Sequence, residues 1–191
     1  MKNTSTLPFL LCLWLLALPA SNFDLAEALN LGSSISSIDS TFDDQTVAAA
    51  DAHKVNIIKK KNGSLEVAYT IDDGDHPTYV QFSLDANYLY TVWQEGLGIL
   101  YQLNASNAYS ELLRVTADRS GGSFAGALRH DVQKIVLCEY EKFKVFSVDF
   151  SAGTATLTLR KTVASLSAYP NIEISSASII KSYIILGVYY G

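Results

Sequence analysis

A recurring aspartate turn constrains this chain of 191 residues more than any other feature of its sequence. Asp43, Asp85 and Asp131 lie 42 and 46 residues apart, and an apolar run begins four residues after each of them. A short segment rich in strand-forming residues precedes each aspartate, and two more such segments follow each apolar run. The chain therefore repeats a unit of about 40–50 residues with four short strands, and such units bury their faces against their neighbours.

Units of this length and strand number predict a β-propeller, in which four-stranded sheets stand side by side as blades. Hydrophobic residues make up 49% of the chain, which is enough material for a folded core. We expect an all-β chain that forms an incomplete β-propeller of about three and a half four-stranded antiparallel blades, preceded by a signal peptide. The blades are expected at residues 35–71, 78–116 and 122–163, with a half blade at 171–190.

One stretch carries a family resemblance. The segment FSLDANYLYTVWQEGLGILYQL resembles a blade of the WD-repeat and YVTN-type propellers, whose pattern begins Phe-Ser-Pro-Asp-Gly. Phe82, Ser83 and Asp85 match that pattern, whereas Leu84 stands in place of proline and Ala86 in place of glycine. The resemblance implies the propeller architecture. It carries over no catalytic residue, because the matching positions are turns and packing strands.

The first 20 residues have the layout of a secretory signal peptide. Lys2 precedes an unbroken apolar run from Leu7 to Leu18, and Pro19, Ala20 and Ser21 then supply a break and small residues. A signal anchor is the alternative, but the run is shorter than the about 20 residues that a bilayer requires. We therefore expect a signal peptide at 1–20, a flexible leader at 21–34, and a protein that is secreted or lumenal in the secretory pathway.

The two cysteines predict that the mature chain has no intramolecular disulfide. Cys12 lies in the signal peptide and leaves with it, so Cys138 remains alone and no intramolecular disulfide forms in the mature chain. Cys138 stands in the apolar run KIVLCEY, which favours a buried, inert thiol. An intermolecular bridge or a reactive thiol is the alternative.

The densest polar segment runs from Asp72 to Asp75 and is followed by His76. Its carboxylates could bind Ca²⁺, but a turn between blades explains the same composition. His53, His76 and His130 fall in three different expected turns, and the sequence contains no nucleophile elbow, P-loop, dinucleotide fingerprint or HExxH. We expect no catalytic residue, no cofactor and no metal. His76 lies closer to Phe82 than the spacing of WD-repeat blades, so the His–Asp–Ser/Thr–Trp network of that family is not expected here. Trp93 lies inside the expected second strand of its blade and is therefore expected in the core.

Two sequons are candidate modification sites. Asn62-Gly63-Ser64 and Asn104-Ala105-Ser106 both fall between the third and fourth strands of their expected blades, 42 residues apart. Asn62-Gly63 is also a strong signal for a type I′ hairpin turn. We expect N-glycosylation at Asn62 and Asn104 on one rim, with chance occurrence in a turn as the alternative.

Net charge and motif content limit the classes of function and partner that the sequence favours. The formal net charge is −5 and no large basic patch is present, which argues against nucleic acid as a partner. We expect a secreted or lumenal binding scaffold with a protein partner of unknown identity, as a fragment of a longer propeller. The alternatives are a propeller enzyme (a lactonase-like hydrolase or a quinoprotein-like oxidoreductase) and a lumenal sensor domain. No membrane span is expected after signal removal, and open blade edges favour self-association.

Overall fold

The computed structural model describes the following parts of the chain: Leu29 and residues 31–74, 76–117, 125–129, 131, 133–139, 142–149, 156–163, 172–181 and 183–190. Leu31 to Gly191 form one compact unit. The signal peptide expected at 1–20 and most of the leader expected at 21–34 lie outside the described residues. Within those residues, no helix has the length and hydropathy that crossing a membrane requires.

Apart from a 3₁₀ residue at Asp131, the regular structure in the described residues is β-structure, as the sequence predicts. The strands, in chain order, are β1 (Ser37–Ser40), β2 (Thr46–Ala50), β3 (Val55–Lys61), β4 (Ser64–Ile71), β5 (Pro77–Phe82), β6 (Tyr88–Trp93), β7 (Leu97–Leu103), β8 (Tyr109–Thr116), β9 (Gly126–Arg129), β10 (Lys134–Glu139), β11 (Lys142–Asp149), β12 (Thr156–Val163), β13 (Ile172–Ile180) and β14 (Tyr183–Tyr190).

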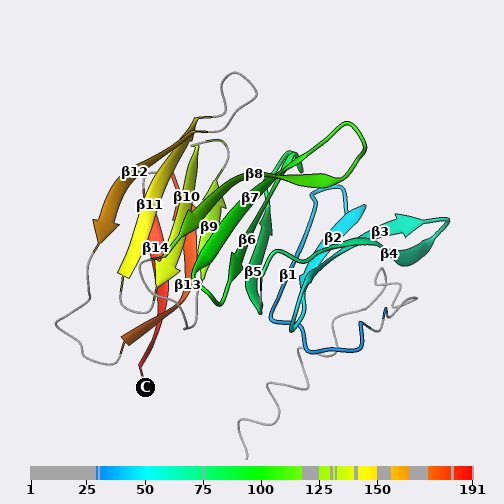
Figure 1. Cartoon of the computed structure of the whole chain (residues 1–191), viewed down its shortest axis with the longest axis horizontal. Helices are drawn as coiled ribbons and strands as arrows, with labels where there is room; N and C mark the ends of the chain where they lie inside the picture. Colours follow the sequence, from blue (N-terminus) through cyan, green and yellow to red (C-terminus); the bar gives the residue numbers. More distant parts are fainter. Residues whose placement is uncertain are drawn as a thin grey trace, which may run out of the picture. The chain divides into compact units, whose positions relative to one another are not determined.

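These strands form three four-stranded antiparallel sheets and one two-stranded sheet (Figure 1). We call them the first sheet (β1–β4), the second (β5–β8), the third (β9–β12) and the fourth (β13–β14). Each four-stranded sheet pairs strands in sequence order. Each also has a register shift between its third and fourth strands, at Ile57/Ile58, Leu100/Tyr101 and Val145/Phe146. A bulge between the third and fourth strands of every four-stranded sheet shows that these units repeat in detail.

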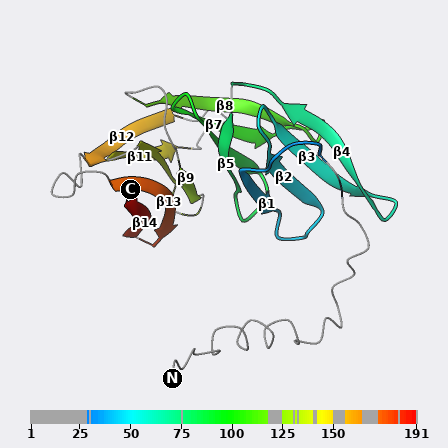
Figure 2. The same cartoon turned by 90° about the horizontal axis from the view of Figure 1, so that it is seen from below.

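The first strands of the sheets lie next to one another. β1 contacts β5, β5 contacts β9, and β9 contacts β13. Figure 2 shows β4, β8 and β12 along the opposite side of the assembly. The turns that follow β1, β5 and β9 are therefore brought together.

The core consists of layers between successive sheets. Ile57 and Trp93 pack between the first and second sheets, Leu137 belongs to the cluster between the second and third, and Ile174 to the cluster between the third and fourth. Because side chains alternate along a strand, one strand serves two layers. In β6 every residue is buried, and this explains its continuous apolar sequence.

Tyr90 shows how closely the second and third sheets approach. Its side chain is fully buried, and its hydroxyl donates to the carbonyl oxygen of Val136 at 3.2 Å. A Cβ atom at Gly126 would lie only 2.7 Å from the Tyr90 ring and 2.7 Å from Val92. Glycine is therefore the residue that lets the tyrosine ring reach β9.

Cys138 is a buried free thiol, as the sequence predicts. It is 0% exposed in the layer between the third and fourth sheets. Burial raises the pKa of its thiol to about 12, because the thiolate is poorly solvated there.

Candidate functional site

Two of the recurring aspartates hold their turns in the same way. Thr41 donates its hydroxyl to Asp43 at 2.6 Å, and Ser83 donates to Asp85 at 2.6 Å. Each carboxylate also accepts the backbone N–H two residues further on, at 3.2 Å. The residue after each aspartate has a positive φ, of 56° and 58°. The repeated aspartates are therefore turn formers that fix the path from the first strand to the second.

The third turn departs from this pattern. Arg129 stands two residues before Asp131, where the other turns have a hydroxyl. Its Nε and Nη2 donate to the two Asp131 oxygens at 2.6 and 2.8 Å, and its Nη1 donates to the carbonyl oxygen of Ile179 at 3.1 Å. The guanidinium thus fixes the turn and links the third sheet to the fourth. The sequence analysis did not single out Arg129; the signal was a charged residue at the position of Thr41 and Ser83.

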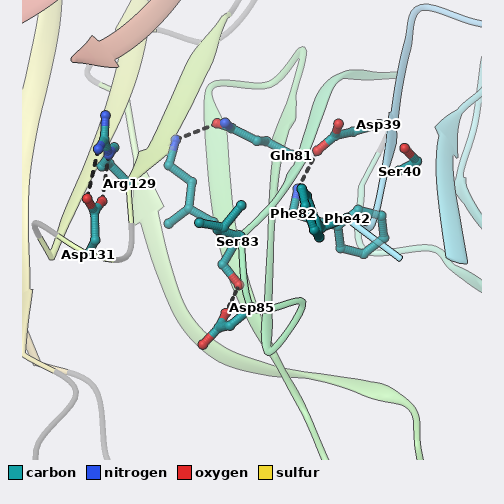
Figure 3. Close-up of a pocket in the computed structure, with 11 residues that line it drawn as sticks. Asp39, Ser40, Phe42, Gln81, Phe82, Ser83, Asp85, Arg129 and Asp131 are labelled. Carbon is teal, nitrogen blue, oxygen red and sulfur yellow. Dashed lines mark hydrogen bonds and ion pairs between the residues drawn. The ribbon is translucent and has the colours of Figure 1, made fainter. Parts of the chain in front are cut away.

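A pocket of about 670 Å³ opens where these turns converge (Figure 3). Its lining comes from β1, β5 and β9 and from the turns that follow them. Three carboxylates, of Asp39, Asp85 and Asp131, and the guanidinium of Arg129 line it, so acidic groups outnumber basic ones.

Two polar side chains of the lining join successive sheets. Asp39 Oδ2 accepts the backbone N–H of Phe82 at 2.7 Å, and Gln81 Oε1 accepts that of Leu128 at 2.7 Å. The hydroxyl of Tyr79 also donates to Gln81 Oε1, at 2.7 Å. Burial raises the pKa of the Asp39 carboxyl, an effect that its hydrogen bonds partly offset. The pocket therefore has a rigid wall in which polar groups are satisfied.

The rim of the pocket is apolar and exposed. Phe42 is 86% exposed and Leu84 is 82% exposed, and each stands directly before a turn aspartate. The equivalent residue in the third turn, His130, lies outside the described residues. Large exposed apolar side chains at equivalent positions of one concave site are typical of a binding surface. The sequence analysis recorded Leu84 only as a departure from the family pattern, and that departure was the signal.

No protein-family model matches the sequence. No curated protein matches it either. Solved structures do match the fold, and three are representative. The Cps50 (Swd1) β-propeller domain of Myceliophteria thermophila has a TM-score of 0.58 and 11% identity, over 76% of this chain and 47% of that one. The RRP9 WD40 repeats have a TM-score of 0.60 and 14% identity, over 85% and 53%.

A putative 6-phosphogluconolactonase from Bacteroides fragilis has a TM-score of 0.64 and 17% identity, over 81% of this chain and 47% of that one. The fold is that of a β-propeller, the architecture that these WD40 domains and the lactonase-like protein share. The chain spans about half the length of these three structures. The resemblance drawn from the sequence is thereby confirmed, and the four sheets are its blades.

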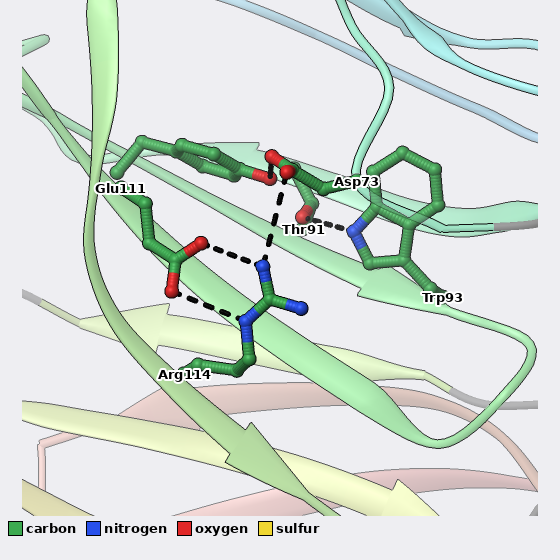
Figure 4. A network of polar contacts seen from close by, with 6 residues as sticks. Asp73, Thr91, Trp93, Glu111 and Arg114 are labelled. Carbon is green, nitrogen blue, oxygen red and sulfur yellow. Dashed lines mark hydrogen bonds and ion pairs between the residues drawn. The ribbon is translucent and has the colours of Figure 1, made fainter.

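The acidic segment between the first two blades has a structural role (Figure 4). Asp73 accepts a hydrogen bond from the Tyr101 hydroxyl at 2.7 Å and lies 3.8 Å from Arg114, which also pairs with Glu111 at 2.6 Å. Burial raises the pKa of the Tyr101 hydroxyl, which therefore stays a donor. Asp75 lies outside the described residues. Among the described residues, no group of three or more metal-ligating side chains lies together.

Trp93 is in the core, as expected. Its side chain is 0% exposed, and its indole N–H donates to Thr91 Oγ1 at 2.8 Å. The rings of His53 and His76 lie 5.5 Å apart, although the sequence placed them in separate turns. Both are exposed and neither lines the pocket, so the structure gives them no role in that site.

Both sequons lie in exposed turns between the third and fourth strands of their blades. Asn62 and Gly63 both have positive φ, of 53° and 90°, as a type I′ turn requires. The Asn104 side-chain oxygen accepts the backbone N–H groups of Ser106 and Ala108 at 2.9 and 3.1 Å. Asn104 therefore already supports its turn with its side chain.

Proposed function

We propose that this chain is a propeller-type binding module of the secretory pathway or the extracellular space, and that the pocket receives a segment of a partner protein. The observation that carries the proposal is the apolar rim. Phe42 and Leu84, at 86% and 82%, are the most exposed large hydrophobic side chains in the described part of the chain. Water-exposed apolar surface beside a concave, polar-walled pocket supports docking of a side chain with mixed character.

A lactonase-like hydrolase is the second candidate, favoured by the fold likeness to the Bacteroides fragilis protein. The hydrogen bonds of the pocket's polar groups argue against a hydrolase activity. Asp39, Asp85 and Asp131 each hold a backbone N–H or a neighbouring side chain in a structural hydrogen bond. A general base needs a carboxylate aimed at the substrate, and a nucleophile needs such a base beside it. This wall supports a binding role better than a catalytic one.

The test compares two rim variants with a matched surface control. Phe42→Asp and Leu84→Asp place a charge on the rim, whereas Val67→Asp places one on β4, where the side chain is 41% exposed. We expect the wild-type chain and the Val67→Asp control to retain the same partner proteins from a secreting host. Both rim variants should lose these partners. Each rim change should then weaken the purified complex about tenfold or more in titration calorimetry. Equal retention by all four proteins would end the proposal for this pocket.

Localisation has its own test. The apolar run before Pro19 supports entry into the secretory route, with loss of about the first 20 residues. N-terminal sequencing of the exported protein should begin near Ser21 or Asn22. A soluble cytosolic product that retains Met1 would contradict export.

A further inference from the structure

Two histidines from different segments of the chain lie together at the junction of the first and second blades. His53 stands in the turn between β2 and β3, and His76 directly precedes β5. Their ring centroids are 5.5 Å apart, and the ring planes are inclined by 40°. The turn after β2 lies at the opposite end of the strands from the turns that form the pocket, so this pair is separate from the proposed binding surface.

The backbone is held in place at both histidines. Asp51 is 3% exposed, and its Oδ1 accepts the backbone N–H groups of His53 at 2.8 Å and Lys54 at 3.0 Å. The carbonyl oxygen of His76 accepts the backbone N–H of Gln94 at 2.9 Å. His76 also has a positive φ of 52°, which a residue other than glycine keeps only where its surroundings fix the chain. Both rings therefore extend from fixed backbones, and a ligand has to order only the side chains.

The separation of the two rings suits one shared metal ion. An imidazole nitrogen binds Zn²⁺ at about 2.0–2.1 Å, which places the ion about 3 Å from the ring centre. Two imidazoles on one tetrahedral ion therefore have centroids about 5 Å apart. The observed 5.5 Å is close to that value. In the part of the chain that the structure describes, neither imidazole takes part in a hydrogen bond or ion pair, and both side chains are exposed, so each ring has room to turn a nitrogen towards one ion.

The charges near the pair favour a cation. Asp72 is exposed in the connection that leads to His76, and Glu95 Oε2 is 3.6 Å from the position that a Cβ atom on Gly74 would take in the same connection. Lys54 is the only lysine or arginine in the turn and the connection that carry the two histidines. Neighbouring carboxylates raise the local concentration of cations. Because the ligands are imidazoles, the pair favours a transition metal over Ca²⁺, which binds oxygen ligands.

We propose that His53 and His76 together bind one divalent transition-metal ion, with Zn²⁺ and Cu²⁺ as its representatives. Imidazole suits these ions, and water completes a site with two protein ligands. The ion links the turn after β2 in the first blade to the chain that enters β5 in the second. It stabilises this junction by mass action, because an unfolded chain does not hold the two histidines together. The sequence placed them in separate turns, and only the fold brings them together.

Calorimetric titration of the metal-free chain with Cu²⁺, Zn²⁺ and Ca²⁺ tests the site. One Cu²⁺ should bind per chain, more tightly than Zn²⁺, and Ca²⁺ should not bind at this pair. His53→Gln and His76→Asn should each weaken Cu²⁺ binding about tenfold or more. Asparagine is chosen at His76 because it tolerates a positive φ. His130→Gln changes the remaining histidine of the chain, so it is the matched control and should bind as the wild type does.

Trp93 supplies a local readout of the bound ion. Its ring lies 3.5 Å from the position that a Cβ atom on Gly74 would take, two residues before His76. A Trp14→Phe chain keeps Trp93 as its only tryptophan, and Cu²⁺ should quench its fluorescence. Either histidine variant should abolish this quenching at the same Cu²⁺ concentration. Saturating Zn²⁺ should also raise the melting temperature of the wild type and leave that of both histidine variants unchanged.

The proposal is overturned if the wild-type chain binds neither Cu²⁺ nor Zn²⁺. Binding that survives both His53→Gln and His76→Asn would place the ion elsewhere, and an equal loss with His130→Gln would do the same. The melting temperatures of the metal-free variants should match that of the wild type, since both side chains are exposed. A loss of metal binding in a variant that melts normally then reports the loss of a ligand.

Discussion

Asp39 on β1 accepts the backbone N–H of Phe82 on β5 at 2.7 Å, although 43 residues separate the two. The bond joins the first strands of consecutive blades and forms part of the pocket wall. Gln81 makes the equivalent bond to Leu128, 47 residues further on. These contacts set the spacing of the strands whose turns form the pocket. The first prediction concerns the bond between Asp39 and Phe82.

Asp39→Ala should lower the free energy of unfolding by about 1–3 kcal/mol, because the Phe82 N–H loses its acceptor in a partly buried place. Asp39→Asn keeps an acceptor oxygen and should lose less. Ser40→Ala, at the exposed neighbouring position, serves as control and should change stability by less than about 0.5 kcal/mol. Urea unfolding at pH 7 measures all three. An alanine variant as stable as the control would show that the bond contributes nothing.

The same carboxyl should leave a pH signature. Burial holds the pKa of Asp39 above its unfolded value of 3.8, so the folded state binds the proton more tightly. This contribution stabilises the fold at a pH below 3.8 and is lost as the pH rises through the folded pKa. Asn cannot titrate, so Asp39→Asn should gain stability relative to wild type as the pH rises from 3 to 7. Paired urea titrations at each pH give the difference, and a fall in place of the rise would reverse the assignment.

Gly126→Ala tests the close approach of the second and third blades. The added Cβ would lie 2.7 Å from the ring of Tyr90, so the ring or β9 must move, and stability should fall by about 1–3 kcal/mol. Gly74→Ala is the matched control, since its Cβ would meet Trp93 at an ordinary 3.5 Å. Thermal unfolding followed by circular dichroism compares the two. Equal melting temperatures would mean that the interface adapts at no cost.

The sequence predicted the blades because their turns depend on local chemistry. Asp43 and Asp85 must accept nearby hydroxyl and N–H groups, and that requirement leaves an aspartate at a regular spacing. The type I′ turn at Asn62-Gly63 was predicted for the same reason, since both residues must take positive φ.

The pocket could not be predicted in the same way. The partner of Asp39 is a backbone N–H on the next blade, and a backbone donor leaves no mark in the sequence. The sequence predicted a strand over the segment that contains Phe42, and an apolar residue in a strand is ordinarily buried. Only the turn geometry shows that it points to solvent, and the same is true of Leu84.

Cys138 should be inert until its blades separate. Its thiol is 0% exposed and its pKa is raised to about 12, so the reactive thiolate is scarce. In a Cys12→Ser chain, Ellman's reagent at pH 8 should label the native protein at least about 100-fold more slowly than the urea-unfolded protein. The rate in native buffer then reports opening between the third and fourth blades. Rapid native labelling would show that this layer opens readily.

The sequons are tested best without touching their asparagines. Asn104 holds its turn through two backbone N–H groups, so replacing it would confuse loss of a glycan with loss of the turn. Ser64→Ala and Ser106→Ala each remove a sequon and leave the asparagine in place. The matched controls Ser64→Thr and Ser106→Thr keep it. In a glycosylating host, wild type and both threonine variants should shift in mobility after glycosidase treatment by the mass of two glycans. Each alanine variant should shift by the mass of one glycan.

Asn62 lies in a two-residue turn and Asn104 in a longer one. Loss of the shift with Ser106→Ala alone would therefore mean that the transferase modifies only the longer turn. A wild-type chain without any shift would end the prediction for both sites.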